Sequence, residues 1–130
     1  QEIKEEGKET DGNPQIKQRI RTVQMEMARK RMMSAVPEAD VIVTNPTHIS
    51  IAIKYDTLNY AAPVVVAKGV GPIAMRIREI AKENNIPLVE DKPLARTLNK
   101  TVQVGQVIPA SLYKAVAEIL AYVYKLKHSF

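Results

Sequence analysis

The sequence predicts an α/β domain: a small sheet of about four strands flanked by helices, with a protruding N-terminal linker helix. Short runs of β-branched residues bounded by turn formers predict the strands, and longer segments with apolar residues at helical spacing predict the helices. A chain of 130 residues is also long enough to bury a real core. We therefore expect residues 1–36 to form a tail and a basic linker helix, and residues 37–130 to form one globular domain.

The N-terminal segment changes character at Gln15. Residues 1–14 combine acids with glycines and a proline, so we expect a frayed start there. Beyond it, apolar residues recur at helical spacing and predict a helix to about Met33. These apolar residues are Ile16, Ile20, Val23 and Met27, and the cations around them are Lys17, Arg19, Arg21, Arg29, Lys30 and Arg31.

Two apolar runs, residues 41–44 and 49–54, predict a pair of strands joined by a tight corner. Pro46 suits the second position of a β-turn, which places Asn45 at the first position. Residues 55–63 then form a loop. The next run, Val64–Ala67, shows no polar alternation, so we expect a strand that is buried on both faces and central in the sheet.

The segment Gly69–Ala74 opens a helix and resembles a dinucleotide-binding fingerprint, with the acid Glu90 about 20 residues further on. Pro72 argues against that reading, because it removes an N–H group that a phosphate would need, and the chain is short for the usual second half. A helix that starts at Pro72 and packs on the sheet is the simpler interpretation. Asn84 and Asn85 end it.

The C-terminal third predicts one more strand and two more helices. Ile86–Val89 is a short strand whose Pro87 suits an edge or a strand start. Asp91 caps a helix that points Leu94 and Leu98 inward. After a polar connector at residues 99–107, Pro109 starts the last helix, which we expect to be mostly buried. Its apolar arc comprises Leu112, Tyr113, Val116, Ala117, Ile119, Leu120, Val123 and Tyr124.

Composition limits the chemistry available to this chain. Without cysteine there are no disulfides or thiolate metal sites, and two widely separated histidines do not suggest zinc, so we expect no metal and no cofactor. The net charge of +5 leaves open a second function, a basic nucleic-acid-binding α/β module. The six aromatic residues, five Tyr and one Phe, do not interleave with cations on a strand, which argues against an RNA-binding sheet.

The pair Asn45-Pro46 has an unusual chemical option. In most Asn-X pairs the backbone nitrogen of X can attack the asparagine side chain, but the nitrogen of Pro46 carries no proton to lose. The remaining route is attack by Asn45 Nδ2 on the Asn45 carbonyl carbon, which closes a succinimide and expels Pro46 as an amine. The structure must then hold a near-attack rotamer and move two protons.

Three nearby side chains are candidates for moving those protons: the imidazole of His48 and the hydroxyls of Thr44 and Thr47. An ordinary imidazole titrates near pH 6.5, which suits either proton transfer. The alternative is a plain hairpin corner without chemistry, because Asn-Pro is a common turn pair and turn geometry alone does not aim the His48 ring.

The motif Thr44-Asn45-Pro46-Thr47-His48 resembles the autocleavage motif of the FlhB/YscU family, the export-switch proteins of bacterial flagella and type III secretion systems. The resemblance runs from about Val41 to Leu126. It continues in order through Val65–Gly69, Arg76–Ala81, Glu83–Pro87, Pro93–Arg96 and Ile108–Tyr113. The segments Lys68-Gly69, Glu83–Asn85 and Ala117–Tyr122 favour the flagellar branch.

This resemblance implies a function. It implies a flagellar export component that cuts itself once between Asn45 and Pro46, with Asn45, Pro46, Thr47 and His48 as the catalytic motif, and that then switches export substrate specificity. Such single-turnover autoproteolysis is not enzymatic turnover of an external substrate. The implied partners are other export-gate membrane proteins, the export ATPase complex, the hook-length control protein and the exported flagellar subunits.

The family also places this domain on the cytoplasmic face of the bacterial inner membrane, behind a membrane-spanning part, and the absence of an initial Met suggests a fragment. The basic helix would then link membrane and domain. Two interpretations of its cations stay open: a solvated surface, or contact with anionic lipid headgroups, which is worth about 1 kcal/mol per cation.

Overall fold

The computed structural model describes residues 12–46, 48–55, 58 and 61–128. The chain divides into two compact units at Arg31 and Met32. Most of the segment in which we expected a frayed start, residues 1–11, lies outside the described residues. Among the residues described, none of the helices has the length and apolar character needed to cross a bilayer.

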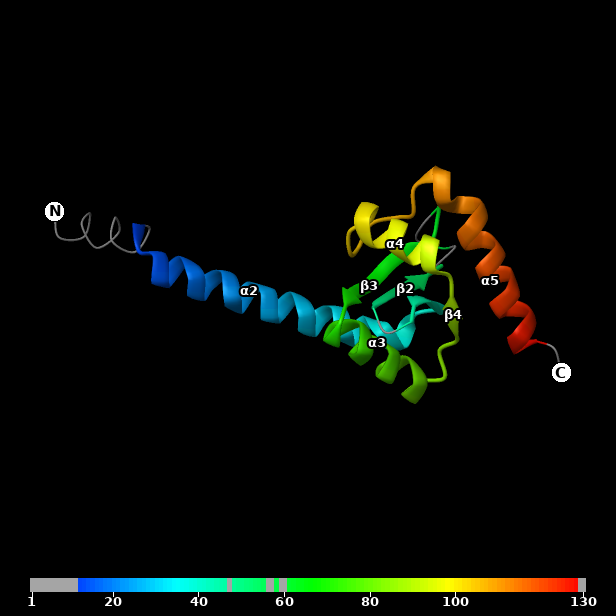
Figure 1. The fold of residues 1–130 in the computed structure, drawn as a ribbon, viewed down its shortest axis with the longest axis horizontal. Coiled ribbons are helices and arrows are strands. Elements are labelled where there is room, and N and C mark those ends of the chain that lie inside the picture. The colour runs from blue at the N-terminus through cyan, green and yellow to red at the C-terminus, as the bar shows by residue number, and fades with distance from the viewer. Residues whose placement is uncertain (1–11, 47, 56–57, 59–60, 129–130) are drawn as a thin grey trace. The chain divides into compact units, whose positions relative to one another are not determined.

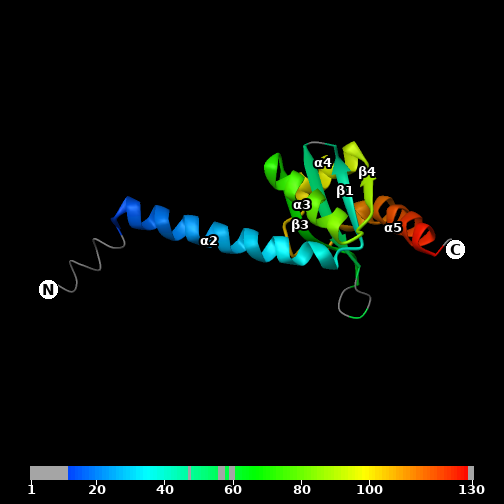
Figure 2. The ribbon, with the colours of Figure 1, turned by 90° about the horizontal axis from the view of Figure 1, so that it is seen from below.

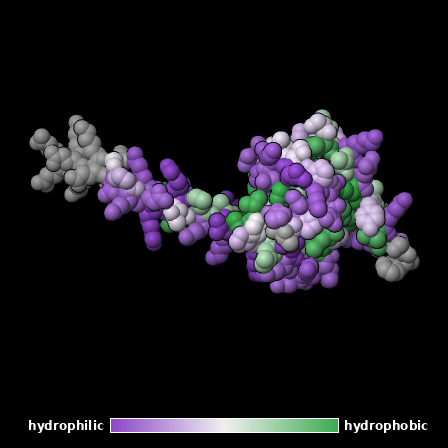
Figure 3. Space-filling view, in the orientation of Figure 1, coloured by the Kyte–Doolittle hydropathy of each residue, from purple (hydrophilic) through white to green (hydrophobic). Residues whose placement is uncertain are grey.

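Helix α2 spans Pro14–Ala35 and confirms the helix predicted from Gln15 to Met33. Its start is capped by Asn13, whose Oδ1 accepts hydrogen bonds from the backbone N–H groups of Gln15 (2.9 Å) and Ile16 (3.4 Å). None of its residues is buried, and even the four apolar residues of the predicted face are exposed. The surface along this helix is largely hydrophilic (Figure 3).

The sheet is mixed and has the order β3-β2-β1-β4. Its strands are β1 (Val41–Asn45), β2 (Ile49–Lys54), β3 (Val64–Val70) and β4 (Leu88–Glu90). Strand β1 is central: it pairs antiparallel with β2 and parallel with β4. The fold class is therefore confirmed, and β4 lies at an edge, directly after Pro87 (Figure 1).

The prediction that Val64–Ala67 is central was wrong, because β3 forms the other edge. Its free edge is covered by the connection after α4. The Val65 N–H donates to Gln106 O (3.1 Å), and Val65 O accepts from the Gly105 N–H (2.7 Å). This irregular cover satisfies the backbone of Val65 at the edge, and the Val65 side chain is fully buried in the core between the sheet and α4 and α5. The strand also runs three residues further than predicted, to Val70.

Helices cover both faces of the sheet (Figures 1 and 2). Helix α3 (Pro72–Glu83) packs on one face, against Ile42 and Ala52. Helices α4 (Lys92–Thr101) and α5 (Tyr113–Lys127) pack on the other. Short 3-10 turns, Val36–Glu38 and Ala110–Leu112, precede β1 and α5.

The predicted details of α4 hold. Asp91 caps the helix, because its Oδ1 accepts from the Leu94 N–H at 3.1 Å, and both Leu94 and Leu98 are buried. The helix continues to Thr101, so the connector begins later than expected, at Val102, and this first residue is itself buried.

The prediction that the last helix is mostly buried was wrong. Only Val116, Ile119 and Val123 of α5 are buried, while Tyr113, Tyr122 and Tyr124 are 45%, 55% and 65% exposed. One line of side chains along α5 packs against the core. Tyr113 and Tyr124, which the prediction counted in the apolar arc, lie outside that line. Tyrosine tolerates such a position because its ring is apolar and its hydroxyl is polar.

Candidate functional site

The corner between β1 and β2 is a hydrogen-bonded turn at residues 45–48. The backbone N–H of His48 donates to the carbonyl oxygen of Asn45 at 3.0 Å. This is the bond that closes a β-turn, so Asn45 holds the first position and Pro46 the second, as predicted. Thr47, the third residue of the predicted site, lies outside the described residues.

The structure places Asn45, Pro46 and His48 together at this corner. Asn45 is half-buried, whereas Pro46 and His48 are exposed. No residue in the described parts of the chain hydrogen-bonds the side-chain amide of Asn45. Among the described residues, therefore, none occupies this amide nitrogen, while the carbonyl of the same residue accepts the His48 N–H.

Thr44 is separated from this group by the pleat of the strand. Successive side chains on a strand point to opposite faces, so Thr44 faces α3 together with Ile42, and Asn45 shares the face of Val43. Thr44 is only 5% exposed. Its hydroxyl is therefore a poor candidate for moving a proton at Asn45, and His48, which is exposed, is the other candidate among the described residues.

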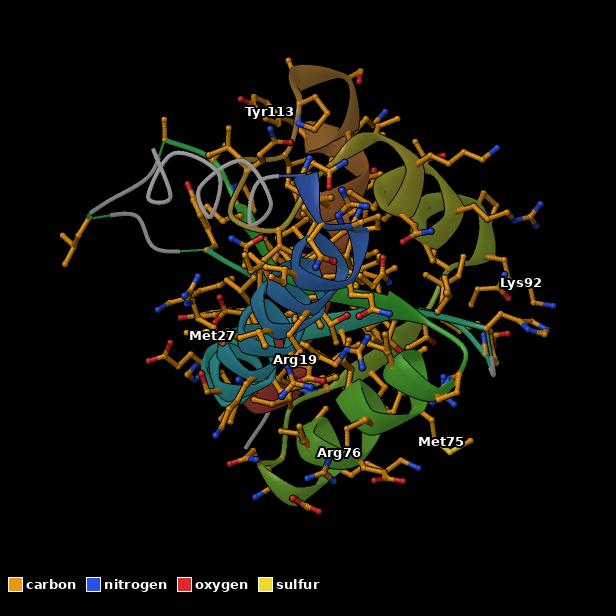
Figure 4. The ribbon with its side chains drawn as sticks, turned by 90° about the vertical axis from the view of Figure 1, so that its left-hand side faces the viewer. Arg19, Met27, Met75, Arg76, Lys92 and Tyr113 are labelled. Carbon is orange, nitrogen blue, oxygen red and sulfur yellow. The ribbon has the colours of Figure 1, made fainter. Side chains whose placement is uncertain are left out.

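The segment before the Asn45–Pro46 bond is firmly held. Val41, Ile42 and Val43 are fully buried, and β1 has a strand on each side. Thr44 O also accepts from the backbone N–H of Asp91 at 2.9 Å, which ties β1 to the start of α4. Lys92, the first residue of α4, points outward from this end of the helix (Figure 4).

The segment after the bond is held by the start of α3. His48 O accepts from the Gly71 N–H at 3.0 Å. Ser50, which is fully buried, donates from Oγ to Ala74 O at 2.9 Å. The Gly71 contact could not be predicted from the sequence, because it joins residues that only the β2–β3 pairing brings together.

The same contacts explain the glycine-rich segment without a nucleotide. A Cβ atom at Gly69 would collide with the side chain of Ile73, so the glycine lets α3 begin close against β3. Pro72 is the first residue of α3, as predicted. Among the residues described, no cluster of histidine, aspartate or glutamate could hold a metal ion.

A groove lies at the other end of β2 from the Asn45–His48 corner, and it was not predicted from the sequence. It has a volume of about 280 Å³ and lies between the β2–β3 connection and α5. Its lining is mostly apolar: Tyr55, Ala61, Ala62, Pro63, Tyr113, Ala117 and Leu120. Figure 4 shows Tyr113 at the start of α5. The sequence features that could have indicated this groove are the tyrosines of the last helix and the alanine pair before Pro63.

Comparisons with known proteins identify the family of this chain. The model of the "FlhB HrpN YscU SpaS Family" matches residues 1–123. The flagellar biosynthetic protein FlhB of Escherichia coli (strain K12) is 55% identical over 127 residues, which are 98% of this chain and 33% of that protein. FlhB of Bacillus subtilis (strain 168) is 54% identical over 98% of this chain and 35% of its own length.

Two solved structures are similar as well. The cytoplasmic domain of FlhB from Shewanella putrefaciens has a TM-score of 0.75 at 50% identity, with 78% of each chain covered. The EscU C-terminal domain with an asparagine-to-alanine substitution has a TM-score of 0.69 at 33% identity, with 71% of this chain and 92% of that chain covered. The chain spans about one third of the length of the curated relatives it matches. By sequence and by fold, this chain belongs to the FlhB/YscU family of flagellar and type III secretion export proteins.

Proposed function

We propose that this chain is the cytoplasmic domain of a flagellar protein-export component, which cuts itself once between Asn45 and Pro46 and then switches the specificity of export. The observation that carries the proposal is the corner itself. Asn45 has a side-chain amide that no described residue hydrogen-bonds, a carbonyl that accepts the His48 N–H at 3.0 Å, and a following residue without an N–H.

The reaction balances without any external reagent. Asn45 Nδ2 adds to the Asn45 carbonyl carbon and loses one proton, and the bond from that carbon to Pro46 N breaks as Pro46 N takes up a proton. The products are a C-terminal succinimide on residue 45 and a free amine on residue 46. The exposed imidazole of His48 accepts and returns the proton, directly or through water. Each molecule reacts once, so there is no turnover of an external substrate.

The two products should stay together after the cut. The last five residues of the first fragment form the central strand β1, and three of them are fully buried. Burial of their apolar surface at about 25 cal/mol per Å² and the ladders on both sides hold the fragment in place. The test is electrophoresis of the purified domain with and without denaturation. We expect one species under native conditions and two after denaturation, and a single denatured band after long incubation would refute the proposal.

The export partners need a docking surface, and we propose the groove between the β2–β3 connection and α5 for the exported subunits. It is apolar and accommodates one or two side chains of an extended export signal. Ala117→Trp would fill it, and Glu118→Trp, on an exposed position beside it, is the matched control. We expect the first substitution to reduce secretion of flagellar subunits and the second to leave secretion unchanged.

The other expected partners are the export-gate membrane proteins, the export ATPase complex and the hook-length control protein, at the cytoplasmic face of the inner membrane. For residues 14–31 we propose contact with anionic lipid headgroups, because the cations of α2 are all exposed. Binding of this segment to vesicles with anionic lipid, but not to neutral vesicles, tests that contact. The nucleic-acid alternative receives no support from the comparisons.

A further inference from the structure

Two backbone hydrogen bonds meet at His48, and both concern the bond that is cut. The His48 N–H donates to Asn45 O at 3.0 Å, and His48 O accepts from the Gly71 N–H at 3.0 Å. The second bond extends the β2–β3 ladder by one step, because the last pair of that ladder is Ile49 with Val70. A continuous backbone path therefore links Gly71 to the carbonyl of Asn45.

Gly71 has a conformation that other residues avoid. Its φ is +56° and its ψ is −127°, a combination that is accessible to glycine and strained for residues with a Cβ. No atom lies within 4 Å of a Cβ built at Gly71, so space is not what requires glycine there. What requires it is the backbone direction, which turns the chain from β3 into α3 while the N–H points at His48 O.

The surroundings keep Gly71 in place. On one side β3 pairs with β2 up to Val70, and on the other Gly71 O accepts the Met75 N–H at 3.0 Å in the first turn of α3. The Ser50 Oγ bond to Ala74 O ties that turn back to β2. The sheet and the helix together therefore fix the position of the Gly71 N–H, which in turn orients the His48 backbone.

We propose that the His48 backbone N–H stabilises the negative charge that develops on Asn45 O, and that Gly71 is the positioning residue that aims this donor. The inference rests on the proposed autocleavage. When Asn45 Nδ2 adds to the carbonyl carbon, an electron pair moves onto Asn45 O. When the carbonyl re-forms, the bond to Pro46 N breaks and that nitrogen takes the proton. A donor already 3.0 Å from this oxygen needs little rearrangement as the charge grows.

This assignment gives His48 two separable roles. The backbone N–H acts on the oxygen, whereas the imidazole acts on protons. His48→Ala therefore keeps the backbone donor and loses only the ring. Replacing the peptide bond before residue 48 with an ester, by semisynthesis, does the opposite: it keeps the ring and removes the N–H.

The test compares cleavage rates of folded variants, with folding checked by thermal unfolding. We expect the ester variant to cleave about 100-fold more slowly than the unsubstituted chain, across pH 7 to pH 9, because losing one such donor typically costs that much. Gly71→Ala should cleave about tenfold more slowly, since it weakens the aim of the donor without removing it. Gly105→Ala is the matched control: its φ is also positive, at +90°, it also has no atom within 4 Å of a built Cβ, and it lies away from the corner.

A direct reading of the bond comes from amide hydrogen exchange in the non-cleaving Asn45→Ala background. The His48 and Gly71 amides should be protected there, and Gly71→Ala should lower the protection of His48 without abolishing it. An ester variant that cleaves at the unsubstituted rate, or equal rates for Gly71→Ala and Gly105→Ala, would overturn this inference. Absence of cleavage in the unsubstituted chain would instead overturn the proposed function.

Discussion

Two asparagines in this chain end a regular element and begin a turn, and the proposed cleavage uses only one of them. Asn45 ends β1, and Asn84 follows α3. The side-chain Nδ2 of Asn84 donates to Ile80 O at 2.8 Å, so its nucleophile is used to finish the helix. In the described parts of the chain the amide of Asn45 has no such partner, and its carbonyl accepts the His48 N–H instead.

The residues that follow the two asparagines differ as well. Asn85 adopts a φ of +57° and its N–H donates to Lys82 O at 3.3 Å, whereas Pro46 has no N–H. At Asn84 the nucleophile is occupied. At Asn45 no described residue holds the amide nitrogen, the carbonyl accepts the His48 N–H, and Pro46 has no N–H for the competing attack. The comparison predicts that the reactivity of an asparagine in a turn depends on which of its own groups the fold engages.

The largest effect is expected from Asn45→Ala, which removes the nucleophile and little buried volume. The variant should remain one chain indefinitely and should unfold with the cooperativity of an uncut domain. Mass spectrometry and urea denaturation check the two parts of this prediction. If the variant were still cut after residue 45, attack by the side-chain nitrogen would be excluded.

Pro46→Ala makes Asn45 more like Asn84, because it restores an N–H at the next residue and relaxes the turn. We expect cleavage to be largely lost and a slow loss of ammonia from Asn45 to appear, since the backbone nitrogen of residue 46 can now attack the side chain. Peptide mapping distinguishes the two products. Rapid cleavage without deamidation would show that proline is not what closes the competing route.

His48→Ala should slow cleavage several-fold or more at pH 7 while leaving the Asn45–His48 turn bond in place. Hydroxide also assists succinimide closure, so the difference from the unsubstituted chain should narrow toward pH 9. Rates measured at intervals across that range check both statements. Equal rates at every pH would reduce the His48 side chain to a turn residue.

The smallest effect on cleavage is expected at Asn84. Asn84→Ala should leave the cleavage rate unchanged and should lower the free energy of unfolding by about 1 kcal/mol, because it removes one partly exposed hydrogen bond. Urea unfolding of the uncleaved Asn45→Ala domain, with and without the second substitution, measures this cost. A slower cleavage rate would show that the two turns are coupled.

Much of the fold was predictable because local patterns carried it. The helical spacing in α3 and α4, the Asp91 cap, the Asn45-Pro46 turn and the edge strand after Pro87 all depend on residues close in sequence. The errors concern what covers a buried surface. An apolar run such as Val64–Ala67 indicates a buried strand. It does not indicate whether the neighbour on each side of that strand is another strand or an irregular segment.

The site shows the same division. Asn45, Pro46 and His48 are neighbours in sequence, so their meeting at one corner could be predicted. The contact with Gly71 could not, because it depends on the register between β2 and β3 and on the strand running to Val70. Strand alternation places the side chains of Thr44 and Asn45 on opposite faces of the sheet. The exclusion of Thr44 as a proton carrier could therefore have been predicted from the sequence.

The most direct test of autocleavage is an intact-mass time course of the purified domain at neutral pH, with Asn45→Ala as the control. We expect two masses, for residues 1–45 and 46–130, whose sum at first equals the mass of the uncut chain because succinimide closure consumes no water. The first fragment should then gain one water as the succinimide hydrolyses. A half-life on the order of an hour would correspond to a barrier of roughly 22 kcal/mol. Fragments that already contain the added water when they first appear would point to hydrolysis by a protease, and a single unchanged mass would contradict the account.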